Sequence, residues 1–214
     1  MGKIVVIAGT DSAVGKTYVT SRLAAYCRAR GIDVRAIKLI ETGTQEEPSD
    51  REDGVVIAQA AGQSSPTAAL RRYRAPAAPA EAADREGRPV DIDVMVSETR
   101  AIAREAAITF VEGNGGLLSP ITWKRTLVDV ARVMRAPVIV VAADRLGTLN
   151  HTLLTVSALE LAGVHCLGVV MNRIPGDAHD TTQGTNVASL KQVSPALRVV
   201  ATSGDGWEGE VLGR

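Results

Sequence analysis

The sequence is poor in aromatic residues, in cysteine and in long hydrophobic runs. Phe, Trp and Tyr make up 3% of its 214 residues, which leaves little with which nucleic-acid bases could stack. Cys27 and Cys166 each lie in an apolar segment, and we expect two free thiols rather than a disulfide or a metal framework. No run reaches the ~18 apolar residues of a membrane span, and no secretory leader opens the chain. We therefore expect a cytoplasmic protein without a membrane partner.

Net charge is also lacking. The chain carries 24 Lys and Arg against 24 Asp and Glu, which argues against a protein that coats nucleic acid or a membrane surface. What it has is the composition of an ordinary globular protein, with 45% hydrophobic residues. Its length suits one α/β domain, and we predict a single domain over residues 1–214.

The most informative segment follows an apolar run at 3–8. It reads Gly9-Thr10-Asp11-Ser12-Ala13-Val14-Gly15-Lys16-Thr17, which is typical of a strand, a glycine-bracketed loop and a helix start. Backbone N–H groups and the helix dipole at such a loop favour a polyphosphate. Lys16 would neutralise the β- and γ-phosphate oxygens, and the Thr17 hydroxyl would hold Mg²⁺. Thr10 stands where the usual pattern has its first glycine, so a plain strand-to-helix turn is the alternative.

Apolar segments alternate with helical ones along the rest of the chain. Continuously apolar, β-branched strands separated by helices indicate a parallel sheet that is covered on both faces. We predict an α/β fold with a doubly wound, mainly parallel sheet, which binds ligands at the carboxyl ends of its strands. The predicted strands are 34–40, 108–111, 138–142, 166–171 and 198–201, and the predicted helices are 18–30, 54–61, 92–106, 127–134 and 151–162. We expect a loop at 41–52, an irregular excursion at 74–90, and a binding loop or loose tail at 202–214.

Polar residues follow the predicted strands where each strand ends. Lys38, Glu112, Asp144 and Asn172 would therefore share the ligand-binding edge. Each has a structural alternative. Lys38 could face outward from a half-exposed strand, Asp144 could cap a loop, and Asn172 could form an Asx turn.

Glu112 has the best-supported role of these strand-end residues. An acidic residue at the end of a strand beside a phosphate loop holds Mg²⁺ directly or through water. The glycines that follow would let the backbone approach the phosphates closely, although the segment 112–116 could also be a simple flexible turn. Asp53 could be a second metal ligand or only an N-cap, and its spacing does not decide between them.

Together these motifs resemble the dethiobiotin synthetase family. The family's loop Gly-Thr-Asp-Thr-x-Val-Gly-Lys-Thr is matched at 9–17, including the displaced glycine. Its motifs Lys-Pro-x-x-[ST]-Gly, Val-Glu-Gly-Ala-Gly-Gly and Leu-Gly-x-[IL]-Asn-His are matched in order at 38–43, 111–116 and 146–151. The similarity covers residues 3 to about 175. Departures are Leu39 for proline, Asn114 for alanine, and Ala78-Pro79-Ala80-Glu81 where the family often has a Ser-Pro-His-like segment.

The resemblance implies a P-loop NTPase-like fold and an ATP- and Mg²⁺-dependent ligase of biotin biosynthesis. Such an enzyme converts 7,8-diaminononanoate, CO₂ (or bicarbonate) and ATP to dethiobiotin, ADP and phosphate. The implied catalytic residues are Lys16 and Lys38, the implied substrate-binding residues are Thr42, Gly147 and Asn150, and the implied metal ligands are Thr17, Asp53 and Glu112. ATP contacts are implied at Thr10, Asp11, Ala13, Val14, Gly15, Lys16, Thr17, Tyr18, Asp53, Glu112, Gly113, Asn114, Gly115 and Asn172.

In the family, the helix start that corresponds to 147–150 comes from the partner subunit. The resemblance therefore also implies a homodimer, with no nucleic-acid partner.

A different class of function is the alternative: a deviant P-loop ATPase switch of the partition or septum-site type. Such proteins carry a lysine early in the phosphate loop, where this chain has Thr10-Asp11-Ser12, and many end in an amphipathic membrane helix. This sequence has neither feature. A related amidoligase of the cobyrinic-acid type would need a glutaminase domain with a nucleophilic cysteine, for which we expect no room.

Overall fold

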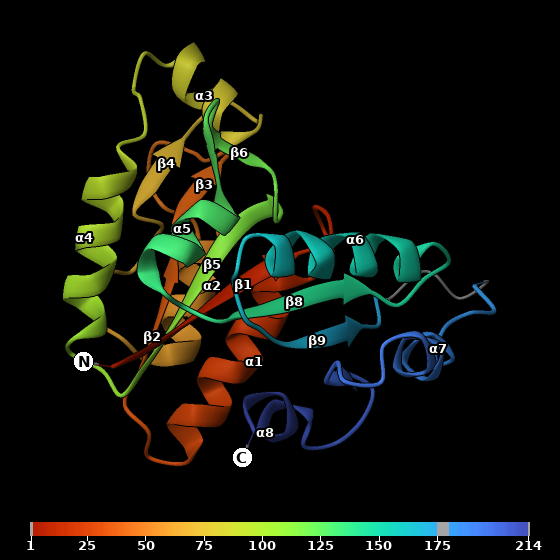
Figure 1. Cartoon of the computed structure of the whole chain (residues 1–214). Coiled ribbons are helices and arrows are strands. Elements are labelled where there is room, and N and C mark those ends of the chain that lie inside the picture. The colour runs from red at the N-terminus through yellow and green to blue at the C-terminus, as the bar shows by residue number, and fades with distance from the viewer. Residues whose placement is uncertain (1, 175–179, 214) are drawn as a thin grey trace.

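The computed structural model describes residues 2–174 and 180–213, which are built around a six-stranded sheet (Figure 1). All its neighbouring strands pair in parallel, in the order β10-β9-β8-β1-β5-β2. The chain builds one side of β1 first and then crosses to the other, which places a ligand crevice at the carboxyl ends of the central strands. The strands are β1 (Lys3–Gly9), β2 (Val34–Lys38), β5 (Ile108–Gly116), β8 (Val138–Ala143), β9 (Cys166–Asn172) and β10 (Val199–Ala201).

Strand β1 shows why both faces of the sheet are covered. Val5 and Ile7 pack into one hydrophobic core, and Ile4 and Val6 pack into the other. The first core is completed by α1 (Lys16–Ala29), α2 (Asp53–Ala61) and α8 (Trp207–Leu212). The second is completed by α3 (Pro79–Arg85), α4 (Ile92–Ala103), α5 (Leu127–Met134), α6 (Thr148–Leu161) and α7 (Asn186–Val193). The predicted α/β fold is confirmed, and no helix in the described residues is both long and apolar enough to cross a membrane.

Short strand pairs extend the fold beyond the main sheet. Strand β3 (Ile40–Thr42) pairs with β4 (Arg71–Tyr73), and β6 (Pro120–Thr122) forms a hairpin with β7 (Arg125–Thr126). The predicted strand 34–40 is therefore wrong in its last part. The last bond to β5 runs from the N–H of Leu39 to the Glu112 carbonyl at 3.1 Å, and the Lys38 carbonyl already accepts the N–H of Leu70 at 3.0 Å. Periodicity does not report such a change of partner strand.

Two segments that we predicted to be irregular contain helices. Residues 74–90 include α3, which has Pro79 in its first turn, where a missing N–H costs no hydrogen bond. Residues 202–214 include α8, whose Trp207 is 2% exposed. Glu208 of the same helix pairs with Arg22 of α1 at 2.5 Å. Helix α8 was not predicted because its glycine-rich sequence has a low helix propensity. Packing of its side chains against the rest of the fold holds it in place.

The boundaries of three further elements differ from the prediction by three residues or more, and the other bounds differ by one or two residues at most. The helix that begins after Asp91 ends at Ala103, not at 106, and α6 begins three residues before the predicted start at His151. Residues 112–116 belong to β5 rather than to a flexible turn. The Asp91 carboxylate caps α4, as its position predicted, by accepting the N–H of Val94 at 3.0 Å.

We expect the two tryptophans to contribute very differently to stability. Trp207→Ala should lower the free energy of unfolding by about 3–5 kcal/mol, because it opens a cavity in the core beneath α1. Trp123→Ala should lower it by about 1 kcal/mol or less, since Trp123 is 66% exposed and bonds only to Asp84. Urea denaturation followed by circular dichroism measures both. Similar losses would show that α8 is not anchored through Trp207.

Candidate active site

The loop between β1 and α1 approaches its neighbours so closely that two of its residues must be glycine. A Cβ atom at Gly15 would lie 2.0 Å from Nδ2 of Asn172, and Gly15 has φ +89°. A Cβ atom at Gly9 would lie 2.6 Å from the Asp11 carbonyl oxygen. Gly9 thus provides the close approach that the usual pattern assigns to its first glycine, which explains why Thr10 is tolerated there.

Lys38 and Glu112 form a buried ion pair beside this loop. Their strands pair in register, so Lys38, the last residue of β2, lies beside Glu112 in the middle of β5. Nζ of Lys38 is 2.7 Å from Oε1 of Glu112 and 2.7 Å from Oδ2 of Asp53. The Thr17 hydroxyl donates to Oε1 of Glu112 at 2.9 Å, and the Thr20 hydroxyl donates to Oε2 at 2.6 Å. Side chains from β2 and α1 therefore converge on one carboxylate that is 0% exposed.

This arrangement gives the two lysines different acid strengths. Burial, together with the nearby positive charge of Lys38, lowers the pKa of Lys16 to about 8. Burial also opposes the charge on Lys38, but Glu112 and Asp53 outweigh that effect and raise the pKa of Lys38. Burial would raise the pKa of Asp53, yet Lys38 outweighs it and lowers that pKa. Lys38 is therefore a fixed cation, whereas Lys16 is the lysine that can lose its proton near pH 8.

These side chains line an open cavity of about 400 Å³. A neighbouring cavity of about 350 Å³ shares Thr42 and Gly115 with it and extends to the segment 76–79. The charged space thus continues into a space that is lined by the apolar residues 76–79 on one side and by uncharged polar residues, among them Ser12 and Ser119, on the other. The first cavity is lined by Ser12, Ala13, Gly15, Lys16, Thr17, Lys38, Glu41, Thr42, Asp53, Asn114 and Gly115.

The oxygen groups at the first cavity suit a magnesium ion that arrives with a nucleotide. Thr17 and Asp53 line the cavity, and the buried carboxylate of Glu112 lies behind Thr17, so a hydroxyl and two carboxylates are available as ligands for a hard cation. No group of three or more His, Cys, Asp or Glu that could hold a metal alone occurs in the residues that the structure describes. Mg²⁺ in proteins is usually held by one or two carboxylates together with substrate phosphates, so this donor set fits the ion.

The structural alternatives for the strand-end residues have different outcomes. Lys38 is 3% exposed, so it does not face outward. Asp144 is a loop cap, because it accepts bonds from the Gly184 N–H at 2.8 Å and from Nδ2 of Asn186 at 2.7 Å. Asn172 bonds across the fold rather than within a turn. Its Nδ2 donates to the Val14 carbonyl at 3.0 Å, so it braces the phosphate loop.

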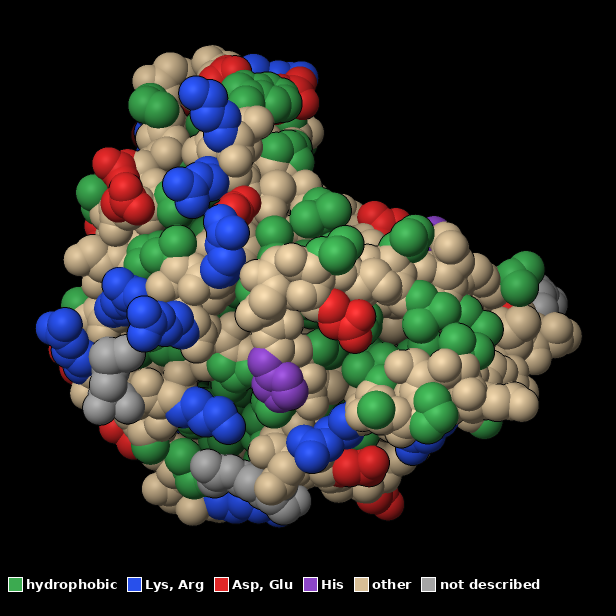
Figure 2. Space-filling model, in the orientation of Figure 1, with side chains coloured by type: hydrophobic (Ala, Val, Ile, Leu, Met, Phe, Trp, Pro, Cys, Tyr) green, Lys and Arg blue, Asp and Glu red, His purple; other side chains and the backbone are tan. Residues whose placement is uncertain are grey.

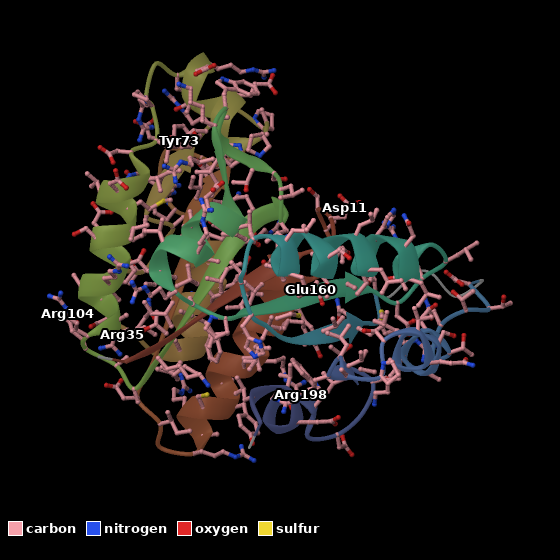
Figure 3. All side chains as sticks on the ribbon, in the orientation of Figure 1. Asp11, Arg35, Tyr73, Arg104, Glu160 and Arg198 are labelled. Carbon is pink, nitrogen blue, oxygen red and sulfur yellow. The ribbon has the colours of Figure 1, made fainter. Side chains whose placement is uncertain are left out.

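Other predicted site residues lie outside the charged cavity. Thr10 and Asp11 line a separate hollow of about 290 Å³ beside α6, and Asp11 is labelled there in Figure 3. Tyr18 is half-exposed on α1 and lines neither of the two joined cavities. Gly113 packs against Leu127, and the side chain of Val14 is buried in the core under α1. Gly147 and Asn150 are exposed at the start of α6.

Sequence reasoning missed two residues that support the site. Thr20 lies three residues after Thr17, one helical turn along α1, and this spacing could have pointed to it. Glu41 occupies an unspecified position of the motif at 38–43. Its carboxylate accepts the N–H groups of Asp53 at 2.5 Å and Gly54 at 2.9 Å.

Known proteins resemble this chain over most of its length. The ATP-dependent dethiobiotin synthetase BioD of Anaeromyxobacter dehalogenans (strain 2CP-C) is 41% identical over 191 residues, which cover 88% of this chain and 84% of that protein. The protein of the same name from Mycobacteroides abscessus is 38% identical over 206 residues, which cover 94% of this chain and 87% of that protein. This chain belongs to the ATP-dependent dethiobiotin synthetase family. A family model described as an AAA domain also matches residues 3–202.

Solved structures that resemble this dethiobiotin synthetase family member include proteins of the alternative class. The MinC:MinD cell division complex of Aquifex aeolicus has a TM-score of 0.59 at 13% identity, over 100% of this chain and 87% of that chain. A ParA family ATPase from Chlorobium tepidum has a TM-score of 0.56 at 11% identity, over 100% of this chain and 90% of that chain. At such low identity the likeness shows a shared P-loop fold and nothing about function.

The lowered pKa of Lys16 predicts that nucleotide binding takes up a proton. Above pH 8 the neutral form of Lys16 becomes the major one in the free protein, whereas a bound polyphosphate favours the ammonium form. Binding of ADP should therefore take up almost one proton at pH 9 and almost none at pH 6.5. Isothermal titration calorimetry in buffers of different ionisation enthalpy measures this uptake. Lys16→Arg, which stays charged at both pH values, is the control that should abolish it. The same heats at pH 9 in all buffers would contradict the prediction.

Proposed function

We propose that the joined cavities of this family member carry out ATP-dependent dethiobiotin synthesis, with Lys16, Lys38 and Mg²⁺ at the reacting phosphoryl group. The family has the ligase activity of biotin biosynthesis. The observation that supports this use of the site is the position of Lys38. Its ammonium is buried, is paired with Glu112 and Asp53, and lines the first cavity, which joins the second one at Thr42. We also propose that the chain acts as one domain.

The chemistry requires positive charge at that position. CO₂ adds to one amine of the diamine to give a carbamate and a proton. A carbamate oxygen takes the γ-phosphoryl group of ATP, which releases ADP and leaves a carbamic–phosphoric mixed anhydride. The second amine then attacks the carbonyl carbon and loses a proton, and phosphate departs as the ring closes. The middle step brings two anions together, so fixed cations there stabilise its transition state.

Each proposed role follows from a position in the cavities. Lys16 faces the polyphosphate, because it lies in the loop and lines the first cavity. Lys38 contacts the carbamate and the transferred phosphoryl group, and Thr42 hydrogen-bonds a substrate nitrogen where the two cavities meet. Thr17, Asp53 and Glu112 would hold Mg²⁺, which would offset charge on the phosphate oxygens.

A homodimer is part of the same proposal. Gly147 and Asn150 lie away from the charged cavity of their own chain, so a second copy would have to supply the helix start that receives the substrate carboxylate. Large apolar side chains are exposed around α6, including Leu146 and Leu154. Figure 2 shows hydrophobic side chains along the region of this helix. Such a surface suits contact with another subunit.

The test of the proposed function is product formation. The purified protein is incubated with 7,8-diaminononanoate, bicarbonate, ATP and Mg²⁺, and dethiobiotin is measured by mass spectrometry together with the release of ADP. We expect ADP and dethiobiotin in equal amounts, and no ADP release above background without the diamine. ATP hydrolysis that is independent of the diamine, with no dethiobiotin, would instead favour the partition-type switch.

Lys38→Met should separate catalysis from binding. Methionine keeps the aliphatic stem and removes the charge, so turnover should fall by ~10²-fold or more, as when a preorganised charge stabiliser is lost. ATP binding should change far less, because Lys16 and the loop amides remain. Steady-state kinetics and equilibrium ATP binding measure the two effects, after circular dichroism has verified the fold. Turnover within threefold of the parent would remove Lys38 from the chemistry.

A further inference from the structure

We propose that Glu41 is a positioning residue, which holds Asp53 at the metal-binding side of the charged cavity. The inference rests on the proposed function, because it takes Asp53 to be a metal ligand. Glu41 lies on β3 and is 8% exposed. Its Oε1 accepts the N–H of Asp53 at 2.5 Å, and its Oε2 accepts the N–H of Gly54 at 2.9 Å. Both oxygens are thus used on the first turn of α2.

Asp53 is held at both ends by one short stretch of chain. Its side chain pairs with Lys38, the last residue of β2, and its backbone N–H pairs with Glu41, three residues further on. The polar loop 43–52 that leads to Asp53 is itself tied to β4, where Arg72 bonds to the Gln45 and Glu46 carbonyls. The stretch 38–41 is anchored to the neighbouring strands, so it fixes both the position and the direction of the Asp53 carboxylate.

The start of α2 is also fixed on its other side. A Cβ atom at Gly54 would lie 2.3 Å from the backbone nitrogen of Ala69, so the helix start packs directly on the chain that leads into β4. Loss of the Glu41 contacts would leave two amide groups without their acceptor in a place where the helix has little room to shift. The expected result is a misdirected Asp53 rather than a fully unfolded helix.

Glu52, the N-cap residue of α2, also carries a carboxylate, but this carboxylate has other partners. Glu52 pairs with Arg72 through contacts of 2.8 and 2.7 Å, and it accepts the N–H of Ser49. These bonds tie the loop to β4 and do not involve Asp53. Glu41 is therefore the carboxylate at this helix start that contacts the proposed metal ligand directly.

Metal affinity measured without turnover tests the inference. Mn²⁺ replaces Mg²⁺, and its binding in the presence of ADP is followed by electron paramagnetic resonance. Glu41→Gln keeps the side-chain size and one acceptor oxygen, and we expect the Kd for Mn²⁺ to rise threefold or more. In an Asp53→Asn background the same change should add less than twofold, because Glu41 acts through Asp53.

Asp91→Asn is the matched control. Asp91 also caps a helix start with its carboxylate, at α4 and outside both cavities. The Kd of the Asp91→Asn variant for Mn²⁺ should stay within twofold of the parent value, even if its thermal stability falls as much as that of Glu41→Gln. If Glu41→Gln does not fold, Glu41→Asp, which keeps the charge on a shorter side chain, takes its place in the same titrations.

Three results would overturn the inference. The first is a Kd for Mn²⁺ in the Glu41 variant within twofold of the parent. The second is an equal loss of affinity in the parent and Asp53→Asn backgrounds. The third is a parent protein that binds no Mn²⁺ with ADP. A parent that binds Mn²⁺ and ADP but forms no dethiobiotin would overturn the proposed function alone, and the role of Glu41 would still follow from the metal titrations.

Discussion

The charge of the Glu112 carboxylate, which is fully buried on β5, constrains the arrangement of the whole site. A buried charge without partners would cost several kcal/mol, so the fold must bring it a cation and hydrogen-bond donors. Lys38 lies beside Glu112 because β2 pairs with β5 in register. The Thr17 and Thr20 hydroxyls reach the carboxylate because α1 packs beside both strands. A slip of one residue in the register of β2 would turn Lys38 to the other face of the sheet. The strand pairing and the electrostatics of the site are therefore one requirement.

The phosphate loop depends on a second contact across the fold. Gly15 leaves no space for a side chain because Asn172, at the end of β9, lies against it and bonds to the Val14 carbonyl. Thr202, which follows β10, donates in turn to Oδ1 of Asn172 at 3.1 Å. Strands on both sides of β1 thus restrain the loop, one through Glu112 and the other through Asn172. The loop is shaped before any ligand is bound, which reduces the entropy that binding would cost.

Much of the fold could be predicted because its main sheet is buried on both faces. That burial demands apolar runs, and such runs mark β1, β8 and β9 in the sequence. Helix α5 was predicted with its observed bounds, 127–134, from its helical period, and the structure adds a capping box formed by Thr126 and Asp129. Helix α8 was missed because its stability comes from Trp207 in the core and not from its glycine-rich sequence. Strand β3 was missed because its partner, β4, lies about thirty residues further along the chain.

Some residues of the site could likewise be predicted from a sequence motif, whereas others were found only from the fold. Gly15, Lys16 and Thr17 could be assigned because a polyphosphate requires those residue types at that spacing. Glu41 could not, since its partners are backbone N–H groups that carry no sequence signal. The pairing of Lys38 with Asp53 could not be predicted either, because the sequence of the loop 43–52 does not determine where the loop places Asp53. The roles of all these residues remain our proposals, whereas their proximity is a property of the fold.

Septum-site and partition proteins share the fold of this chain but not its family. Features that come from the fold alone can therefore be told apart from features that belong to the family. A P-loop fold places N–H groups of a helix start at the edge of a parallel sheet. This chain shares that fold with a neighbour of 13% identity. A phosphate site alone would serve a switch as well as a ligase. What a ligase needs in addition is room for an acceptor beside the phosphate and a cation at the boundary between them. Here a second cavity joins the first at Thr42 and Gly115, and the ammonium of Lys38 lines the first. Two carboxylates of the same chain, Asp53 and Glu112, stabilise the charge of Lys38 and fix the position of its ammonium. The position of this cation therefore does not depend on ATP or on the acceptor.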